Sequence, residues 1–313
     1  GWNAEKLQLA LDYAGRNQST GVVILWKGRI IAEQYWKLSG KNSAKFNQRL
    51  VGRDASGHGI EDIASCQKSV ASVLIGIAQE KRLLNLDDPV NKHISPGWSR
   101  ATRAQEDAIT IRHLLTMTSG LSSRLQYVTQ PGKRWAYNTA AYARTMDIVE
   151  SVSRMKRNEV TREWLTAAIG MSDSRWVPRG QLGVQAGNAF GFATTAKDLA
   201  RFGLLMLANG KWNEKQVFQD QKYSLAATTS SQRLNPHYGY LWWVSRNRFD
   251  ATAPVRPATG PTEMYAAKGA LNRRCFVVPA RQLVVTRLGD QPADGKSFDV
   301  RFWKLLMDAA PKQ

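Results

Sequence analysis

The chain has 313 residues and a formal net charge of +19, which results from 44 Lys and Arg against 25 Asp and Glu. Hydrophobic residues make up 43% of the sequence, yet no apolar run reaches the roughly 20 residues that span a bilayer, so we expect a soluble globular protein with one large domain or two lobes. The positive charges are scattered and form no zinc-finger or RNP-like motif, so the composition indicates weak attraction to anionic envelope polymers and no specific nucleic-acid binding.

The N-terminal part predicts a helix followed by a hairpin. Residues 3–15 place leucines and alanines among charged residues, as an amphipathic helix does. Residues 20–36 (TGVVILWKGRIIAEQYW) predict two strands around a turn at Lys27-Gly28. Residues 37–59 are polar and rich in Gly, Ser and Asn, which predicts a loop.

The middle of the chain is mainly helical by its pattern. A helix headed by Ser65 has apolar residues at i, i+3, i+4 and i+7 on one face, namely Val70, Val73, Leu74 and Ile77. Helical patterns continue from about residue 85 to 225. Gly210 follows the last of them and predicts its C-terminal end.

The C-terminal part returns to strands. YLWWVS is strand-like, and after a connection rich in Pro and Arg the sequence predicts three strands, near 263–268, 273–279 and 282–287. A closing helix, FDVRFWKLLMDAA, ends the chain.

These elements predict an α/β (α+β) fold in which strands from both ends form one antiparallel sheet flanked by the terminal helices. The sheet lobe would comprise residues 1–62 and 238–313. Residues 63–237 would form a mainly helical lobe, with an active-site cleft between the two.

Metal and cofactor chemistry finds little support in the sequence. The two cysteines, Cys66 and Cys275, form no CxxC pattern, and the four histidines form no HExxH pattern, so we expect no metal and no organic cofactor. The two cysteines either form a disulfide or remain buried thiols.

A serine and a lysine three residues apart, Ser65 and Lys68, stand at the head of the apolar helix. Residues i and i+3 share a helix face, so the Lys68 amine can reach the Ser65 hydroxyl. Burial favours the neutral amine, and a neutral amine beside a serine is a general base beside a nucleophile. The backbone N–H of Ser65 at the helix start can stabilise an oxyanion. Ser65 is therefore either a catalytic nucleophile or a capping serine.

The same spacing occurs a second time, at Ser153 and Lys156. This pair lies late in a helix rich in charged residues, where we expect Lys156 to extend into water. The spacing by itself is therefore weak support for catalysis.

Several segments, in order, resemble the serine β-lactamase-like hydrolases, which include class C β-lactamases, DD-peptidases, family VIII esterases and 6-aminohexanoate-dimer hydrolases. The segments are SCQKSVASVLIGIA, TIRHLLTMTSGL, PGKRWAYNTAAYA, GMSDSRWV, GFATTAKDLARFGLLMLANGKW, YGYLWWV and AAKGALNRRCFVVPARQLVVTRLGD. The resemblance covers nearly the whole chain. It implies a β-lactamase/transpeptidase-like fold and an acyl-enzyme mechanism without a metal or cofactor.

The resemblance also implies roles for individual residues. Ser65 is identified as the acylated nucleophile and Lys68 as its base, and Tyr137 as the phenol that moves the proton to and from the leaving group. The N–H groups of Ser65 and Ala270 would form the oxyanion hole, with Gly269 closing the third family motif.

Two departures from the family pattern affect the expected substrate. The Tyr-x-Asn motif has Thr139 in place of asparagine, and the Lys-Thr-Gly motif is Ala267-Lys268-Gly269 here. A one-residue shift along a strand turns a side chain to the opposite face. Thr139, Lys268 and Gly269 are therefore the expected substrate-binding positions of an esterase or an amidase of small linear amides, with a true β-lactamase disfavoured.

The tryptophans near these segments, Trp135, Trp242 and Trp243, either line an apolar acyl pocket or are ordinary core residues. His113 is expected to be either a core residue or a residue that supports the site without touching the substrate, and His58 to lie near the cleft at most. Specificity is expected to depend on the loops at 37–59, 122–135 and 244–262.

Other functions and the cellular location stay open. A catalytically idle relative that binds cell-wall peptide or another envelope component is the alternative. The first residues, GWNAEKLQLAL, show no basic segment followed by an apolar run, so the protein is either cytoplasmic or the mature form of an exported chain. The family resemblance implies a periplasmic or secreted bacterial protein.

Overall fold

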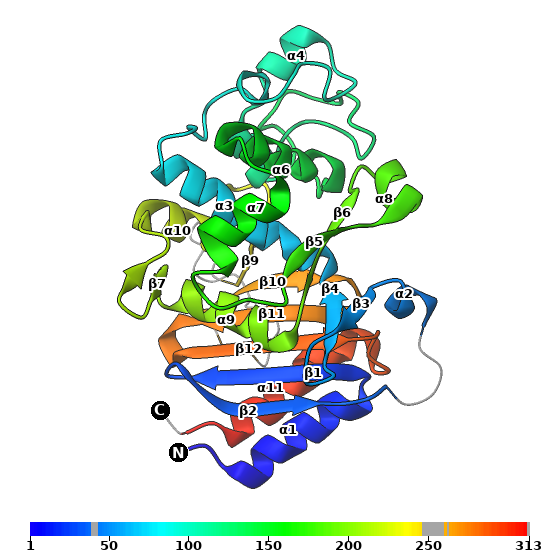
Figure 1. Ribbon diagram of the computed structural model, residues 1–313, viewed down its shortest axis with the longest axis vertical. Coiled ribbons are helices and arrows are strands. Elements are labelled where there is room, and N and C mark those ends of the chain that lie inside the picture. Colours follow the sequence, from blue (N-terminus) through cyan, green and yellow to red (C-terminus); the bar gives the residue numbers. More distant parts are fainter. Residues whose placement is uncertain (39–42, 246–259, 262, 312–313) are drawn as a thin grey trace.

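The computed structural model describes residues 1–38, 43–245, 260–261 and 263–311. A six-stranded antiparallel sheet forms the base of the molecule, in the order β2-β1-β12-β11-β10-β9 (Figure 1). Strands from the two ends of the chain therefore lie side by side. The strands are β1 (Ser19–Trp26), β2 (Arg29–Tyr35), β9 (Trp243–Val244), β10 (Tyr265–Gly269), β11 (Arg273–Val278) and β12 (Leu283–Gly289).

The terminal helices α1 (Ala4–Arg16) and α11 (Phe298–Ala309) lie together against one face of this sheet. The side chain of Asn3 accepts a hydrogen bond from the Lys6 N–H at 2.9 Å and so begins α1. Each helix turns its apolar stripe toward the strands, and Trp303 of α11 is fully buried there. The antiparallel sheet with flanking terminal helices is confirmed.

The opposite face of the sheet carries α3 (Gln67–Glu80) and α9 (Ala196–Leu207). Alternation along the strands separates the two cores, because Val22 of β1 faces the terminal helices whereas Val23 packs under α3 and α9. Gly203 allows α9 to approach closely, since a Cβ there would lie 2.5 Å from a valine side chain of β12.

The expected end of α9 is also found. The last helical residue is Leu207, and the N–H of Gly210 donates to the Leu205 carbonyl at 2.8 Å. Gly210 has a φ of 82°, and a Cβ at this position would overlap the carbonyl oxygen of Phe218. A residue with a side chain would not fit here.

The middle of the chain supplies further helices, as expected, of which α6 is the longest. These elements are α4 (Arg103–Asp107), α5 (Ile111–Leu115), α6 (Thr139–Ser153), α7 (Arg157–Thr161) with the π-helical turn Arg162–Thr166, α8 (Gly180–Gln185) and α10 (Gln221–Ala227). None of the described helices is both long and apolar enough to cross a membrane.

A second sheet, with the strand order β3-β4-β6-β5, corrects the sequence prediction at two places. Its strands are β3 (Leu50–Arg53), β4 (Gly59–Asp62), β5 (Arg175–Pro178) and β6 (Phe190–Thr194). The pattern of residues 37–59 predicts a loop, but this segment contains α2 (Ala44–Asn47), β3 and the start of β4. The middle of the chain also adds β5, β6 and the short pair β7 (Lys211–Trp212) and β8 (Lys215–Gln216). Strands of two to five residues are too short to show a clear alternation.

The C-terminal strands and closing helix agree with the prediction, whereas YLWWVS forms only the two-residue strand β9. Most of the connection at 244–262 lies outside the described residues. The lobe boundaries at residues 62 and 237 stay a prediction. The helix α9, which comes from the middle of the chain, packs on the six-stranded sheet.

Both cysteines are free thiols and fully buried. Cys66 Sγ lies 3.3 Å from the Arg273 carbonyl oxygen, and Cys275 Sγ lies 3.6 Å from that of Leu199. Burial raises the pKa of the Cys66 thiol to about 12. The disulfide, one of the two alternatives open at the sequence level, is absent from the structure.

Because a thiol reacts through its thiolate and these two are shielded, we expect the native protein to resist 5,5′-dithiobis(2-nitrobenzoic acid). The same reagent should titrate two thiols after unfolding without reductant. A rapidly labelled thiol in the native state, or none after unfolding, would contradict this arrangement.

Candidate active site

The turn that carries Ser65 joins β4 to α3. Ala64 has a φ of 53°, which is uncommon for a residue with a Cβ, and its N–H donates to Asp62 Oδ1 at 2.8 Å. The 3-10 turn Ala64–Cys66 follows and runs directly into α3. Ser65 therefore stands at a helix start, where the first N–H groups have no acceptor within the helix.

Lys68 lies one turn further along α3 and keeps only 2% of its surface exposed. Its Nζ is 3.3 Å from Ser65 Oγ and 3.3 Å from Thr139 Oγ1. The rings of Tyr137 and Tyr142 cover the amine, with centroids at 4.8 and 4.3 Å. Burial, with the nearby Arg179 cation as a smaller contribution, lowers the pKa of Lys68 to about 7. The lowered pKa favours a neutral amine beside Ser65.

The start of α6 brings Tyr137 and Thr139, both predicted site residues, to the Lys68 amine. Tyr137 is a hydrogen-bond partner of Ser65, and burial of its phenol raises the pKa. Asn138 caps α6 through the Ala141 N–H and donates to the Leu121 and Ser122 carbonyls at 3.0 and 2.9 Å. Asn138 thereby fixes the backbone that carries Tyr137 and Thr139, a role that the sequence analysis missed.

A pocket of about 350 Å³ brings five of the predicted site residues together with Trp243. Its lining consists of Ser65, Tyr137, Trp243, Lys268, Gly269 and Ala270. Ala270 begins a 3-10 turn directly after β10, so its N–H, like that of Ser65, has no acceptor within its own turn. A Cβ at Gly269 would overlap the Ile63 carbonyl oxygen, so only glycine allows β10 to approach the Ser65 turn this closely.

Aromatic side chains form one wall of this pocket. Trp243 stacks on Tyr137 with ring centroids 6.0 Å apart, and Trp135 contacts both rings from behind. Trp242 is fully buried and stacks on Phe202 instead. Of the two alternatives open for the tryptophans, Trp243 therefore lines the pocket and Trp242 is a core residue.

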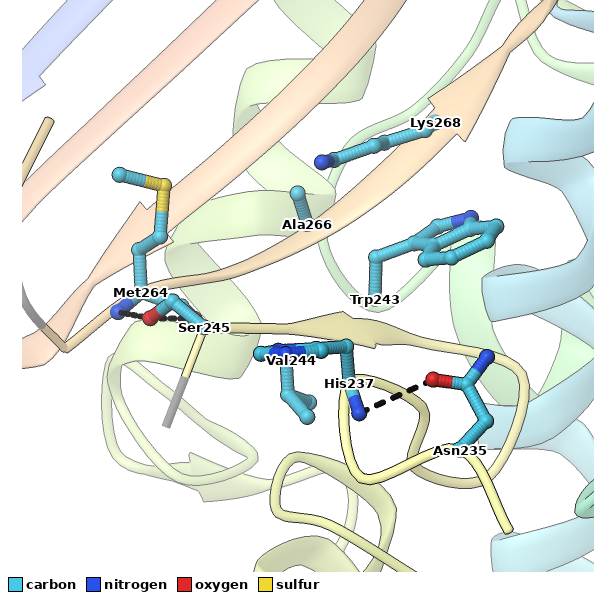
Figure 2. A pocket seen from close by; sticks show the side chains of 8 residues that line it. All are labelled: Asn235, His237, Trp243, Val244, Ser245, Met264, Ala266 and Lys268. Carbon is cyan, nitrogen blue, oxygen red and sulfur yellow. Dashed lines mark hydrogen bonds between the residues drawn. The ribbon is translucent and has the colours of Figure 1, made fainter. Parts of the chain in front are cut away.

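Lys268 turns toward the opposite face of β10 from Ala267, as the one-residue shift predicts, yet it still reaches the pocket. Ala266 and Ala267 belong to different cores, and Lys268 follows the side of Ala266. Its Nζ lies 5.8 Å from the centre of the Trp243 ring, and among the described residues the pairing of β9 with β10 ends at Ala266, before Lys268. Burial lowers the pKa of Lys268 to about 8. Figure 2 shows Lys268 and Trp243 bordering a neighbouring pocket of about 330 Å³.

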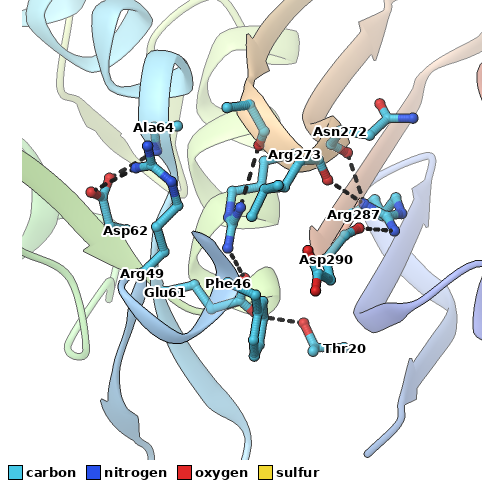
Figure 3. A network of polar contacts seen from close by, with 12 residues as sticks. Thr20, Phe46, Arg49, Glu61, Asp62, Ala64, Asn272, Arg273, Arg287 and Asp290 are labelled. Atoms are coloured by element: carbon cyan, nitrogen blue, oxygen red, sulfur yellow. Dashed lines mark hydrogen bonds and ion pairs between the residues drawn. The ribbon is translucent and has the colours of Figure 1, made fainter. Parts of the chain in front are cut away.

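Three arginines hold the turn that contains Ala270: the buried Arg273 and Arg287, which Figure 3 shows, and the partly exposed Arg274. Arg287 donates to the Leu271 and Asn272 carbonyls at 2.9 and 3.1 Å, and Arg273 donates to the Ala270 carbonyl at 3.3 Å. Arg274 donates to the Gly269 carbonyl at 3.1 Å. Leu271 and Asn272 have φ values of 60° and 58°, so these bonds stabilise a strained turn.

On the other side of Lys68, buried polar groups connect α3 to the second sheet. Gln67 Oε1 accepts hydrogen bonds from the Phe192 N–H at 3.0 Å and from Arg179 at 2.7 Å. Arg179 also binds Asp62 through two nitrogens, both at 2.7 Å. One signal in the sequence could have indicated this contact: Gln67 is a polar residue next to Lys68 within an apolar helix.

The remaining residues that the sequence analysis weighed lie outside the pocket. His113 is part of the cap of α5, with its Nδ1 3.1 Å from the Thr110 N–H, and His58 stacks on Tyr35. Lys156 is exposed, as expected. Among the described residues, no group of three or more His, Cys, Asp or Glu side chains is arranged to hold a metal ion.

Comparison with known proteins places this fold in a family. A family model described as Beta-lactamase matches residues 10–306, so the chain belongs to the beta-lactamase family. Members are generally serine hydrolases that act through an acyl-enzyme, which supports hydrolase activity in general.

Individual relatives are distant. A protein of Alkalihalophilus pseudofirmus described as uncharacterized is 24% identical over 91% of this chain and 86% of its own length. A structure titled as a candidate beta-lactamase from Bacteroides dorei has a TM-score of 0.74 at 16% identity and covers 99% of both chains. A candidate 6-aminohexanoate-dimer hydrolase from Bacillus anthracis has a TM-score of 0.71 at 16% identity and covers 96% of this chain and 80% of its own. These structures share the fold.

Replacement of Arg287 tests whether its hydrogen bonds stabilise the turn that contains Ala270. Arg287→Met leaves several buried carbonyl groups without a donor, so we expect the free energy of unfolding to fall by at least about 3 kcal/mol in urea denaturation. Arg175→Met, at an exposed position of β5, is the matched control and should cost less than about 0.5 kcal/mol. An equal decrease in the free energy of unfolding of the two variants would contradict a structural role for the hydrogen bonds of Arg287.

Proposed function

We propose that the protein is a serine hydrolase that cleaves a small ester or a linear amide through an acyl-enzyme on Ser65. The observation that carries this proposal is the position of the buried Lys68, whose Nζ lies 3.3 Å from Ser65 Oγ. Burial lowers the pKa of this amine to about 7. A lysine that only packed in the core would not need a serine hydroxyl at the head of the same helix. The family membership of the chain supports the same reaction type.

In the first step, neutral Lys68 accepts the proton of Ser65 as the serine oxygen attacks the substrate carbonyl carbon. The carbonyl π electrons move to its oxygen, and the N–H groups of Ser65 and Ala270 donate to the resulting oxyanion. One well-placed donor of this kind contributes about 3–4 kcal/mol to the transition state. The bond to the leaving alcohol or amine then breaks, and the leaving group takes the proton through Tyr137.

In the second step, water attacks the acyl carbon and gives its proton to the same Lys68–Tyr137 pair. The bond between Ser65 Oγ and the acyl carbon breaks, which releases a carboxylic acid and restores the serine. No metal or organic cofactor enters this scheme.

Two contacts support esters and linear amides over β-lactams as substrates. Thr139, at the position where the family pattern has an asparagine, is a hydrogen-bond partner of Lys68 at 3.3 Å, so its hydroxyl serves the base. Lys268 reaches the pocket from the opposite face of β10 and lies over Trp243. Trp135, behind Trp243 and Tyr137, then supports the apolar wall next to the substrate. A periplasmic or secreted location, the usual one in the family, is part of this proposal.

Replacement of the nucleophile tests the proposal directly. Ser65→Ala should abolish the release of p-nitrophenol from p-nitrophenyl butyrate and the matching acyl increment in the intact mass. The fold should survive, because a hydroxyl at a helix start contributes only about 1 kcal/mol. Lys68→Ala should lose nearly as much activity, since the base is removed.

Ser153→Ala is the matched control, because Ser153 begins the second Ser-x-x-Lys spacing and Lys156 is exposed. This variant should retain wild-type turnover. Full activity in Ser65→Ala would exclude the acyl-enzyme. A folded wild type without turnover or adduct would favour the envelope-binding alternative.

The pH dependence of kcat/KM tests the role of Lys68. The reaction needs the neutral amine, and burial lowers the pKa of Lys68 from 10.5 to about 7. The rate should therefore rise with pH, reach half its maximum near pH 7 and then level off, after subtraction of spontaneous ester hydrolysis. An inflection near pH 10, the ordinary range of lysine, would show that the base is not a buried amine.

A further inference from the structure

A large pocket lies on the other side of the Ser65–Lys68 pair from the aromatic wall. It has a volume of about 800 Å³, and its lining includes Thr139 of α6, Arg49 before β3 and Arg179 after β5. Thr139 Oγ1 is 3.3 Å from Lys68 Nζ, which is itself 3.3 Å from Ser65 Oγ. The pocket, called the Arg49–Arg179 pocket below, therefore begins two contacts from the nucleophile.

The charges in this pocket do not balance. Arg49 and Arg179 both bind Asp62, which is the only acidic residue in the described lining. Two cations and one anion give this lining a net charge of +1. The three side chains are 26%, 15% and 5% exposed, respectively, so water screens them only in part.

The oxygens of Asp62 are fully used. Arg179 binds both of them, and the Ala64 N–H and Arg49 Nη1 add bonds at 2.8 and 3.0 Å. Arg49 has five N–H donors, and among the described residues one hydrogen bond from its side chain is found, to Asp62. Its remaining donors are available to an anion in the pocket.

The position of Tyr137 in the proposed mechanism indicates which part of the substrate enters the Arg49–Arg179 pocket. In the proposed mechanism the leaving group receives its proton from Tyr137, which lines the pocket with Trp243. The leaving group therefore occupies the aromatic side. The acyl group extends the other way, past Thr139, toward Arg49 and Arg179.

We infer that the Arg49–Arg179 pocket binds a carboxylate at the far end of the acyl group, which makes the preferred substrates half-esters or half-amides of dicarboxylic acids. This inference rests on the proposed function. Walls formed by Leu50, Val51, Val177 and Pro178 suit the methylene chain between the two carboxyl groups. A guanidinium with unused N–H groups is a strong partner for a carboxylate in a partly desolvated site.

The test compares mono-p-nitrophenyl adipate with its neutral methyl ester, methyl p-nitrophenyl adipate. The leaving group and the chain are the same, so the ratio of the two kcat/KM values reports the terminal carboxylate. We expect the wild type to prefer the acid by about tenfold or more, the effect of one good charged hydrogen bond, mainly through KM.

Arg49→Gln should lower this ratio about tenfold and leave hydrolysis of the neutral ester nearly unchanged. Arg49→Lys should keep part of the preference, because the charge remains while the fork of donors is lost. Arg103→Gln is the matched control, since Arg103 forms an exposed ion pair with Asp107 and its loss changes the net charge equally. This control separates the pocket from general attraction to a +19 protein.

A measurement on the wild type alone covers the case in which Arg49→Gln fails to fold. Adipate should inhibit hydrolysis of the neutral ester competitively, whereas adipamide should not. Cleavage of both esters at equal rates, or inhibition by adipamide as strong as by adipate, would overturn the carboxylate pocket and leave the serine hydrolase standing. Absence of release and of any adduct with both esters would overturn the proposed function and the pocket together.

Discussion

The buried ion pair between Glu61 and Arg273 connects the two sheets of the molecule. Both side chains are fully buried, the N–O distance is 2.7 Å, and Thr20 of β1 also bonds to Glu61. Glu61 lies in β4, which leads into the Ser65 turn, and Arg273 begins β11, which follows the Ala270 turn. Such a pair contributes little net stability because desolvation offsets the attraction, but it allows few alternative arrangements. Its effect here is to fix the two proposed oxyanion donors relative to each other.

Desolvation also governs how the buried basic groups near the pocket are accommodated. Burial lowers the pKa of Lys68 to about 7 and so favours its neutral form, whereas Arg287 donates five hydrogen bonds, four of them to backbone carbonyls. Burial and the nearby Arg274 and Arg273 cations lower the pKa of Arg287 to about 9, so it remains charged at neutral pH. The two side chains thus respond to desolvation in opposite ways. Lys68, which contacts two hydroxyl groups, becomes easier to deprotonate, whereas Arg287 stays charged because backbone carbonyls accept its hydrogen bonds. Only the first leaves a reactive base.

The sequence predicted the parts of the fold that have long, regular patterns. Residues 20–36 and the three C-terminal strands show the alternation of a sheet, and the helix after Ser65 is apolar over several turns. The strands β3 to β6 were missed because four or five residues cannot display a period. At the site, helix geometry predicted that Ser65 and Lys68 lie close together, and the family resemblance implied their roles. The contact of Lys68 with Thr139, by contrast, joins residues 71 positions apart. Arg49, Asp62 and Arg179 lie in three separate segments of the chain, and both arginines bind the aspartate. No local sequence pattern predicts such a contact.

The differences from the penicillin-recognising pattern fall on a consistent set of positions. Under the proposed function, the residues that move protons, Ser65, Lys68 and Tyr137, keep both their identity and their mutual contacts. The residues at the edges of the pocket differ: Thr139 contacts the base, and Lys268 enters from the far side of β10. An acyl-transfer site depends on short, directional contacts that tolerate little change, whereas substrate-binding positions need only complementary charge and shape. Under the proposed function, the net positive charge beyond Thr139 is the feature of this cleft that most narrows the choice of substrate, because it favours an acyl group that carries an anion over a neutral one.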